Sequence, residues 1–313
     1  MRKILLASTA LVALGSISAH AADVTISGAY NFMYRIDSEN PNDGAAGNAS
    51  GDESGFANEG DIDIKFSNTT DSGITTTLHL GGDQGSAIGQ DDLNASLTSD
   101  FGTVYFDAIG DDVALGGFDG KSNKAGEGTN ATNDGANSIS ASNGLMGTGD
   151  LSIGMKLPTI VDGLSVAVSA ADTNGGAEYF GYGVGYTFGM INLGYIKEAT
   201  NTAENTYAGL GATFGDFSIG VDTSNRDNGA AANDRESTVY GVSYNLGDIT
   251  LGYEMGAMDD GTGTELVNHK QIAASYTVAP GITAIFTNSE VDAATAGGLT
   301  DVDQNELQLK LAF

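Results

Sequence analysis

The sequence contains no cysteine and no tryptophan, and only 3 of its 313 residues are proline. Without cysteine the chain can form neither a disulfide framework nor a thiolate metal site. Basic residues are also scarce, because Lys and Arg number 12 against 41 Asp and Glu, which gives a formal net charge of −29. A chain this acidic would be repelled by phosphates, so the composition argues against nucleic acid as a partner.

Long apolar runs are missing as well. After residue 21 no stretch approaches 18 apolar residues, so we expect no transmembrane helix. The single apolar run, residues 4–17, follows the basic pair Arg2 and Lys3 and precedes Ala19-His20-Ala21, a small-x-small site. This order is typical of a secretory signal peptide. We therefore predict a signal peptide over residues 1–21, cleavage after Ala21, and an exported domain over residues 22–313.

The most informative pattern that is present is alternation. In the last segment, Leu307, Leu309, Leu311 and Phe313 share one face of a predicted strand, with polar or small residues between them. A lone strand at this place would fray or leave an exposed edge. Pairing with the first strand of the chain in a closed barrel would satisfy its backbone, and lipid would surround its apolar face.

The same alternation recurs in sixteen segments. Their apolar positions span residues 24–36, 62–66, 74–80, 93–97, 104–108, 151–157, 164–170, 180–188, 191–195, 208–214, 217–221, 240–246, 249–255, 272–278, 282–286 and 307–313. An even number of strands is what a closed antiparallel barrel with both ends on one side requires. Tight turns follow the even-numbered segments, and longer polar connections follow the odd-numbered ones. The sequence therefore predicts an all-β fold, a 16-stranded antiparallel transmembrane β-barrel.

The placement of charge supports a barrel with an apolar outside. A charge facing lipid near the midplane costs roughly 2–4 kcal/mol, so charges should face the lumen. The charged residues on the predicted polar face are Arg35, Asp61, Asp63, Lys65, His79, Asp92, Asp107, Lys156, Asp222, Glu254 and Lys310. In the alternative, a water-soluble barrel or sandwich, each of these charges would be buried and would need a partner.

Together these features resemble one known family, the Gram-negative general diffusion porins, and within it the alphaproteobacterial (Rhodobacter-type) group. The resemblance is carried by Ala19-His20-Ala21, by the first strand beginning Asp23-Val24-Thr25-Ile26-Ser27-Gly28, by sixteen strands with a long third loop, and by Phe313. It implies a homotrimer in the outer membrane of a Gram-negative bacterium, in contact with lipid and lipopolysaccharide. It also implies passive diffusion of ions and small hydrophilic solutes.

The longest connection, residues 109–149, is the predicted constriction loop. A barrel of this strand number leaves a wide aqueous lumen, which something must narrow if permeation is to be size-selective. In the family that this chain resembles, the third loop folds into the barrel and does so. The resemblance places constriction acids at Asp107, Asp111, Asp112, Asp119 and Glu127, facing wall cations at Arg35, Lys65 and His79.

The chain departs from that family in its arginines. Outside the predicted signal peptide it has only Arg35, Arg226 and Arg235, whereas the family tends to carry a cluster on the wall. We therefore expect a weak transverse field, a net negative lumen and a preference for cations. The alternative is that the negative charge belongs to solvated loops. Acidic loops could also bind Ca²⁺ or Mg²⁺, shared with lipopolysaccharide phosphates, although no segment has EF-hand spacing.

Nothing in the sequence indicates an enzyme. Only His79 and His269 remain beyond the predicted signal peptide, and there is no Gly-x-Ser-x-Gly, His-Glu-x-x-His or phosphate-binding loop. We predict no catalytic residue and no cofactor. Two other readings stay open, namely a substrate-specific outer-membrane channel of the same fold and a secreted β-rich surface protein.

Overall fold

The structure is a computed structural model that describes residues 23–38, 53–83, 92–107, 114–123, 145, 151–172, 178–230, 233–293 and 302–313. The predicted signal peptide and its cleavage site lie outside these residues. Within the described part of the chain, no helix is long and apolar enough to cross a membrane.

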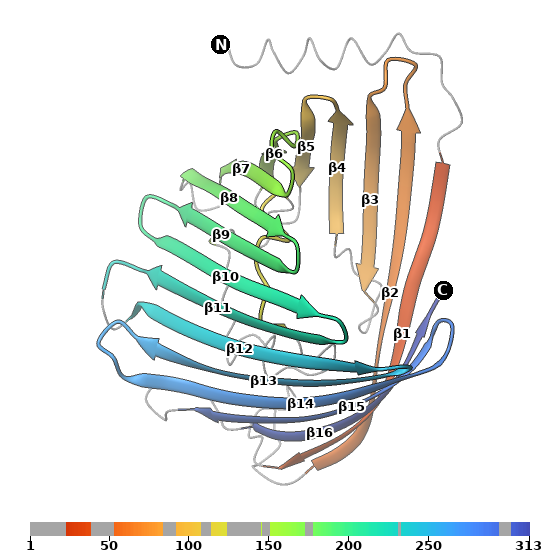
Figure 1. The fold of residues 1–313 in the computed structure, drawn as a ribbon, viewed down its shortest axis with the longest axis vertical. Helices are drawn as coiled ribbons and strands as arrows, with labels where there is room; N and C mark the ends of the chain where they lie inside the picture. Colours follow the sequence, from red (N-terminus) through yellow and green to blue (C-terminus); the bar gives the residue numbers. More distant parts are fainter. Residues whose placement is uncertain are drawn as a thin grey trace.

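Sixteen strands form a single sheet. They are β1 (Asp23–Ser38), β2 (Glu53–Thr69), β3 (Thr75–Asp83), β4 (Asp92–Ser99), β5 (Gly102–Asp107), β6 (Leu151–Lys156), β7 (Leu164–Asp172), β8 (Glu178–Phe188), β9 (Ile191–Ala199), β10 (Glu204–Phe214), β11 (Phe217–Asp227), β12 (Arg235–Leu246), β13 (Ile249–Asp260), β14 (Glu265–Ala279), β15 (Ile282–Ala293) and β16 (Val302–Ala312). Each strand pairs with its neighbours in the chain, and β1 pairs with β16 to close the barrel (Figure 1). The predicted closed 16-stranded barrel is confirmed.

The closure joins the two ends of the described chain. Strands β1 and β16 are antiparallel, with Tyr30 opposite Leu311 and Tyr34 opposite Leu307. Beyond the last ladder pair, the Phe313 N–H donates to the Gly28 carbonyl at 3.0 Å, and the Gly28 N–H donates to the Phe313 carbonyl at 3.1 Å. The final strand is therefore paired to its last residue, as its alternation predicts.

The barrel is apolar outside and polar inside. Large apolar side chains remain exposed on the outer face around most of the barrel, including Ile26, Phe188, Leu246, Ile272 and Leu307. The residues between them point inward, and buried inward positions include Asn31, Gln271, Thr287 and Gln308. A water-soluble protein would bury the first set instead, so this distribution requires lipid around the barrel.

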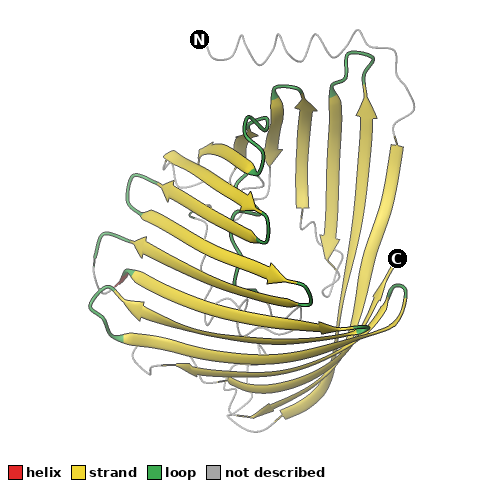
Figure 2. Ribbon diagram, in the orientation of Figure 1, coloured by secondary structure: helices red, strands yellow, loops and turns green. Residues whose placement is uncertain are grey.

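The strands are longer than their apolar stretches. Strand β2 begins at Glu53, nine residues before the first apolar position predicted for it at Ile62. Only residues 200–203 connect β9 to β10, and only residues 261–264 connect β13 to β14. These links are shorter than predicted because ladder hydrogen bonds join backbone groups and can continue through polar side chains. The sorting of loops by length is correspondingly less strict than predicted, since residues 157–163 between β6 and β7 form a longer link (Figure 2).

The tightest links are two-residue hairpins. Phe214 pairs with Phe217 across Gly215-Asp216, and Leu246 pairs with Ile249 across Gly247-Asp248. Gly215 and Gly247 have φ values of 62° and 63°. Positive φ is what the primed turns of two-residue hairpins demand, and glycine meets it without strain.

Candidate pore constriction

Part of the third connection lies against the inner wall of the barrel. Of the loop between β5 and β6, the structure describes residues 114–123 and 145 (Figure 1). Ala114, Leu115 and Phe118 of this loop are buried, in one cluster with inward residues of β7, β9 and β10. Those wall residues are Ala167, Ile196 and Tyr207. The prediction that the long third loop folds into the lumen is confirmed for this segment.

The wall beneath the loop is lined by glycines. We call this surface the glycine trough, and it consists of Gly154, Gly181, Gly183, Gly185, Gly194, Gly209 and Gly220, from β6, β8, β9, β10 and β11. A Cβ on Gly194 would lie 1.6 Å from the Phe118 carbonyl oxygen, and one on Gly220 would lie 1.7 Å from that of Lys121. The loop backbone therefore occupies the space that wall side chains would otherwise take.

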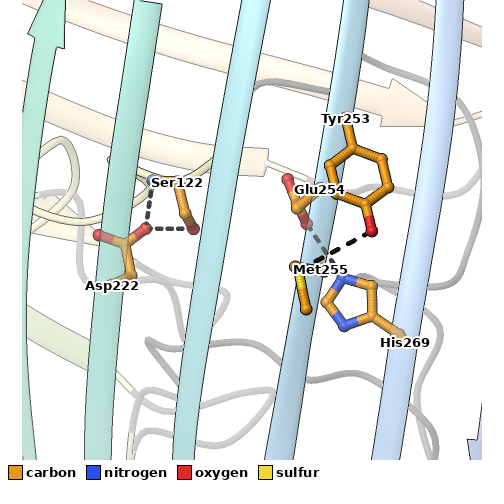
Figure 3. A network of polar contacts seen from close by, with 6 residues as sticks. All are labelled: Ser122, Asp222, Tyr253, Glu254, Met255 and His269. Carbon is orange, nitrogen blue, oxygen red and sulfur yellow. Dashed lines mark hydrogen bonds and ion pairs between the residues drawn. The ribbon is translucent and has the colours of Figure 1, made fainter.

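A buried carboxylate holds the loop at the end of the trough. The Ser122 N–H and hydroxyl both donate to Asp222 Oδ2, each at 2.6 Å (Figure 3). The Tyr207 hydroxyl donates to Asp222 Oδ1. The Asp222 residue is only 1% exposed, and an anion so buried is tolerated because several donors replace its water.

A second buried carboxylate lies on the same wall. Glu198 of β9 accepts a hydrogen bond from the Tyr179 hydroxyl at 2.8 Å and another from Asn205 Nδ2 at 2.8 Å. In these contacts the donors to both buried acids of this wall are neutral hydroxyl, amide and backbone N–H groups.

The predicted constriction acids fall into two groups. Asp119 lies in the loop segment beside Phe118 and is half-buried, and Asp107 ends β5 and is buried. In the ladders, Asp107 stands opposite Asn94 on one side and Ser152 on the other. Asp111, Asp112 and Glu127 lie outside the described residues. Their role in the constriction stays a prediction.

Two of the predicted wall cations are paired with carboxylates. Arg35 Nε lies 2.5 Å from Oε2 of Glu306, its ladder partner on β16. His79 Nε2 lies 2.8 Å from Asp63 Oδ1, while Asn94 Nδ2 lies 3.3 Å from His79 Nδ1. Lys65 is exposed and stands opposite His79 in the β2–β3 ladder. Close pairing reduces what Arg35 and His79 can add to the field across the lumen.

Acidic side chains dominate the same stretch of β2. Glu59, Asp61 and Asp63 occupy three successive inward positions, whereas Ile62 and Ile64 point outward. In the closed order of sixteen strands, β2 is eight strands from β10 in either direction. The acidic stretch of β2 therefore faces the wall that carries the glycine trough. Acids, rather than a cluster of arginines, stand across the lumen from the loop.

A third polar contact lies farther around the wall. His269 Nε2 of β14 is 3.3 Å from Glu254 Oε1 of β13, with the imidazole fully buried (Figure 3). A Cβ on Gly256 would lie 2.9 Å from His269 Cε1, so this glycine makes room for the ring. Among the described residues no group of three or more potential metal ligands is found.

The sequence did not identify the glycine trough or the role of Asp222. One available signal was the run Gly181, Gly183 and Gly185, in which glycine fills three successive inward positions of β8. Inward glycines need an occupant for the space they leave, and the long loop was the obvious one. Ser122 carried no signal, because nothing local relates it to a carboxylate 100 residues away.

Comparisons with known proteins agree with this geometry. A family model described as Gram-negative porin matches residues 7–295. Two solved structures of engineered variants of the Rhodopseudomonas blastica porin each have a TM-score of 0.69 and 14% identity, and cover 93% of this chain and 100% of theirs. A third, titled "Asymmetric conductivity of engineered proteins", has a TM-score of 0.68 and 15% identity over the same shares. No curated protein matches the chain. The chain therefore belongs to the Gram-negative porin family, as an outer-membrane channel and not an enzyme.

Proposed function

We propose that this porin lets ions and small hydrophilic solutes diffuse passively through its lumen and that it prefers cations. The observation that carries the preference is the acidic stretch of β2, formed by Glu59, Asp61 and Asp63. It faces the trough wall, where Asp119 lies on the loop and Asp222 lies beneath it. Carboxylates on opposite sides of an aqueous path attract cations and repel anions.

The state of the nearby basic groups also favours a negative lumen at this level. Arg35 and His79 are each within ion-pair distance of a carboxylate from a neighbouring strand. The partner of His79 is Asp63 of the acidic stretch, so Glu59 and Asp61 remain there against one exposed basic group, Lys65. Charges at successive inward positions of one strand lie closer together than the screening length, which is about 10 Å at 0.1 M salt. The local balance on β2 is therefore negative.

A reversal potential in a salt gradient tests the preference. In a planar bilayer with KCl of unequal concentration, we expect a potential of the sign that cation permeation requires. The variant Glu59→Gln/Asp61→Asn/Asp63→Asn should lose most of it, because the acidic stretch becomes neutral.

A matched control removes equal charge outside the lumen. The variant Glu204→Gln/Asp227→Asn/Glu236→Gln neutralises three acids at the outer ends of β10, β11 and β12. It should keep the wild-type potential. A wild-type potential of zero, or of the anion sign, would contradict the proposal, and so would equal effects of the two triple variants.

We also propose that the porin is a homotrimer, as its resemblance to diffusion porins implies. An aromatic cluster on the outer face of β1 and β2 supports a protein contact there. The Phe32 and Phe56 rings stack with centroids 5.4 Å apart, and the Tyr34 ring is 5.0 Å from that of Phe56. Phe56 remains 73% exposed. The mass of the detergent-solubilised protein, measured by light scattering with the detergent subtracted, distinguishes a trimer from a monomer.

The predicted export of the chain is part of the same proposal. Cleavage after Ala21 would release a domain that starts at Ala22, one residue before β1 begins at Asp23. The intact mass of the protein purified from outer membranes measures the cleavage position directly.

A further inference from the structure

We infer that the glycine trough and Asp222 form a seat that fixes the position of the third loop and, through it, the width of the passage. The inference rests on the proposed channel function. It assigns the loop's position to named residues of the wall, and it makes these positioning residues, because they set the width of the passage only through the loop.

Space, and not backbone conformation, explains the glycines. None of the trough glycines has a positive φ, so any residue could adopt their strand conformation. The corresponding inward positions on other walls carry ordinary side chains, such as Gln271 on β14 and Gln308 on β16. What distinguishes the trough is the loop backbone, which lies where a Cβ would be at Gly194 and Gly220.

The fit involves both backbone and side chains of the loop. At Gly154 an added Cβ would lie 2.2 Å from the Ala114 Cβ, and at Gly183 it would lie 2.7 Å from Cδ2 of the Phe118 ring. The loop thus rests on the wall along its described length, from Ala114 to Ser122. A methyl group under the backbone cannot be avoided by a side-chain rotation, so it must lift the loop away from the wall.

Asp222 fixes the loop to the wall by hydrogen bonds. Its two oxygens accept from Ser122 on the loop and from Tyr207 on the wall, which joins the loop to β10 and β11. Asparagine can accept at one atom only, and its NH₂ group would point toward a donor. The Asp222→Asn change should therefore free the loop while the strands stay paired.

The first experiment lifts the loop. Gly194→Ala and Gly220→Ala place a methyl under loop backbone, whereas Gly211→Ala, on the same wall, meets only the side chain of Asn192. Because lifting moves the loop toward the lumen, single-channel conductance should fall on the order of 1.5-fold in the first two variants. It should stay at the wild-type value in Gly211→Ala.

The second experiment releases the loop and then ties it back. Asp222→Asn should increase open-channel current noise and broaden the distribution of conductance levels. The chain has no cysteine, so Phe118→Cys/Gly183→Cys can be added in this background to tether the loop by a disulfide. Oxidation should return the noise to the level of the tethered protein with Asp222 intact, and reduction should restore the excess.

Heat-modifiable migration on a gel confirms that each variant forms a barrel before it is recorded. If the three alanine variants conduct alike, or if the tether leaves the noise of Asp222→Asn unchanged, the seat does not position the loop. Failure of the proposed function looks different, because the wild-type protein itself would then form no channel. A variant that does not form a barrel is replaced by Gly154→Ala, whose Cβ would lie 2.2 Å from the Ala114 Cβ, an atom that no side-chain rotation can move.

Discussion

At the scale of single residues, the pair between Arg35 and Glu306 combines charge with burial. Glu306 is 2% exposed, and Arg35 Nε lies 2.5 Å from its carboxylate. Replacing Arg35 by methionine keeps most of the side-chain volume but leaves a buried acid without its cation. We expect Arg35→Met to lower the free energy of unfolding by roughly 1–3 kcal/mol. Urea unfolding of the protein folded into lipid vesicles measures this.

The double variant Arg35→Met/Glu306→Gln separates charge from packing. Since the acid is then neutral, most of the lost stability should return. Stability that is unchanged in Arg35→Met, or equally low in both variants, would show that the ion pair does not matter for folding.

The same residues show what a sequence can predict at this scale. Alternation assigns Arg35 to the inward face, and that assignment needs only its neighbours in β1. Its partner is 271 residues away in the chain and meets it only because β1 and β16 close the barrel. Facing is thus a local property that the pattern reveals, whereas pairing depends on ladder register, which the pattern leaves open.

At the scale of strands, alternation divides each element into a lipid face and a lumen face. Leu251 and Thr250 of β13 are adjacent and lie on opposite faces. Leu251→Arg should destabilise the folded barrel by roughly 2–4 kcal/mol, because a charge then faces hydrocarbon. Thr250→Arg should cost much less, since water in the lumen can solvate it. Folding equilibria in lipid vesicles measure both changes.

A reversed order of these two costs would overturn the assignment of faces.

The sequence predicts these faces and the number of strands well, because period-two alternation is a direct consequence of strand geometry. It predicts the strand ends poorly. The ends of β2 and β10 lie in polar residues such as Glu53 and Glu204, where the backbone ladder continues without an apolar signal. The glycine trough was missed for a related reason, since it exists only where a loop meets five strands.

At the scale of the whole molecule, the lumen has two unlike walls. One wall, on β6 to β11, is covered by the described part of the loop and holds Asp222 and Glu198 beneath or beside it. The other includes β2, with its three inward acids. A solute that passes between them meets negative charge on both sides, because the closed order of strands sets β2 opposite β10.

This arrangement predicts how ion selectivity depends on salt. The screening length falls from about 10 Å at 0.1 M to about 3 Å at 1 M, so wall charges act on the centre of the lumen only in dilute salt. The cation-to-anion permeability ratio should therefore decline steeply over this range in the wild-type protein. Reversal potentials at a constant concentration ratio and rising mean concentration measure the decline. In Glu59→Gln/Asp61→Asn/Asp63→Asn the ratio should be lower in dilute salt and nearly flat. A wild-type ratio that does not change with salt would mean that selectivity arises from close contact between ion and loop, and not from the field of the acidic wall.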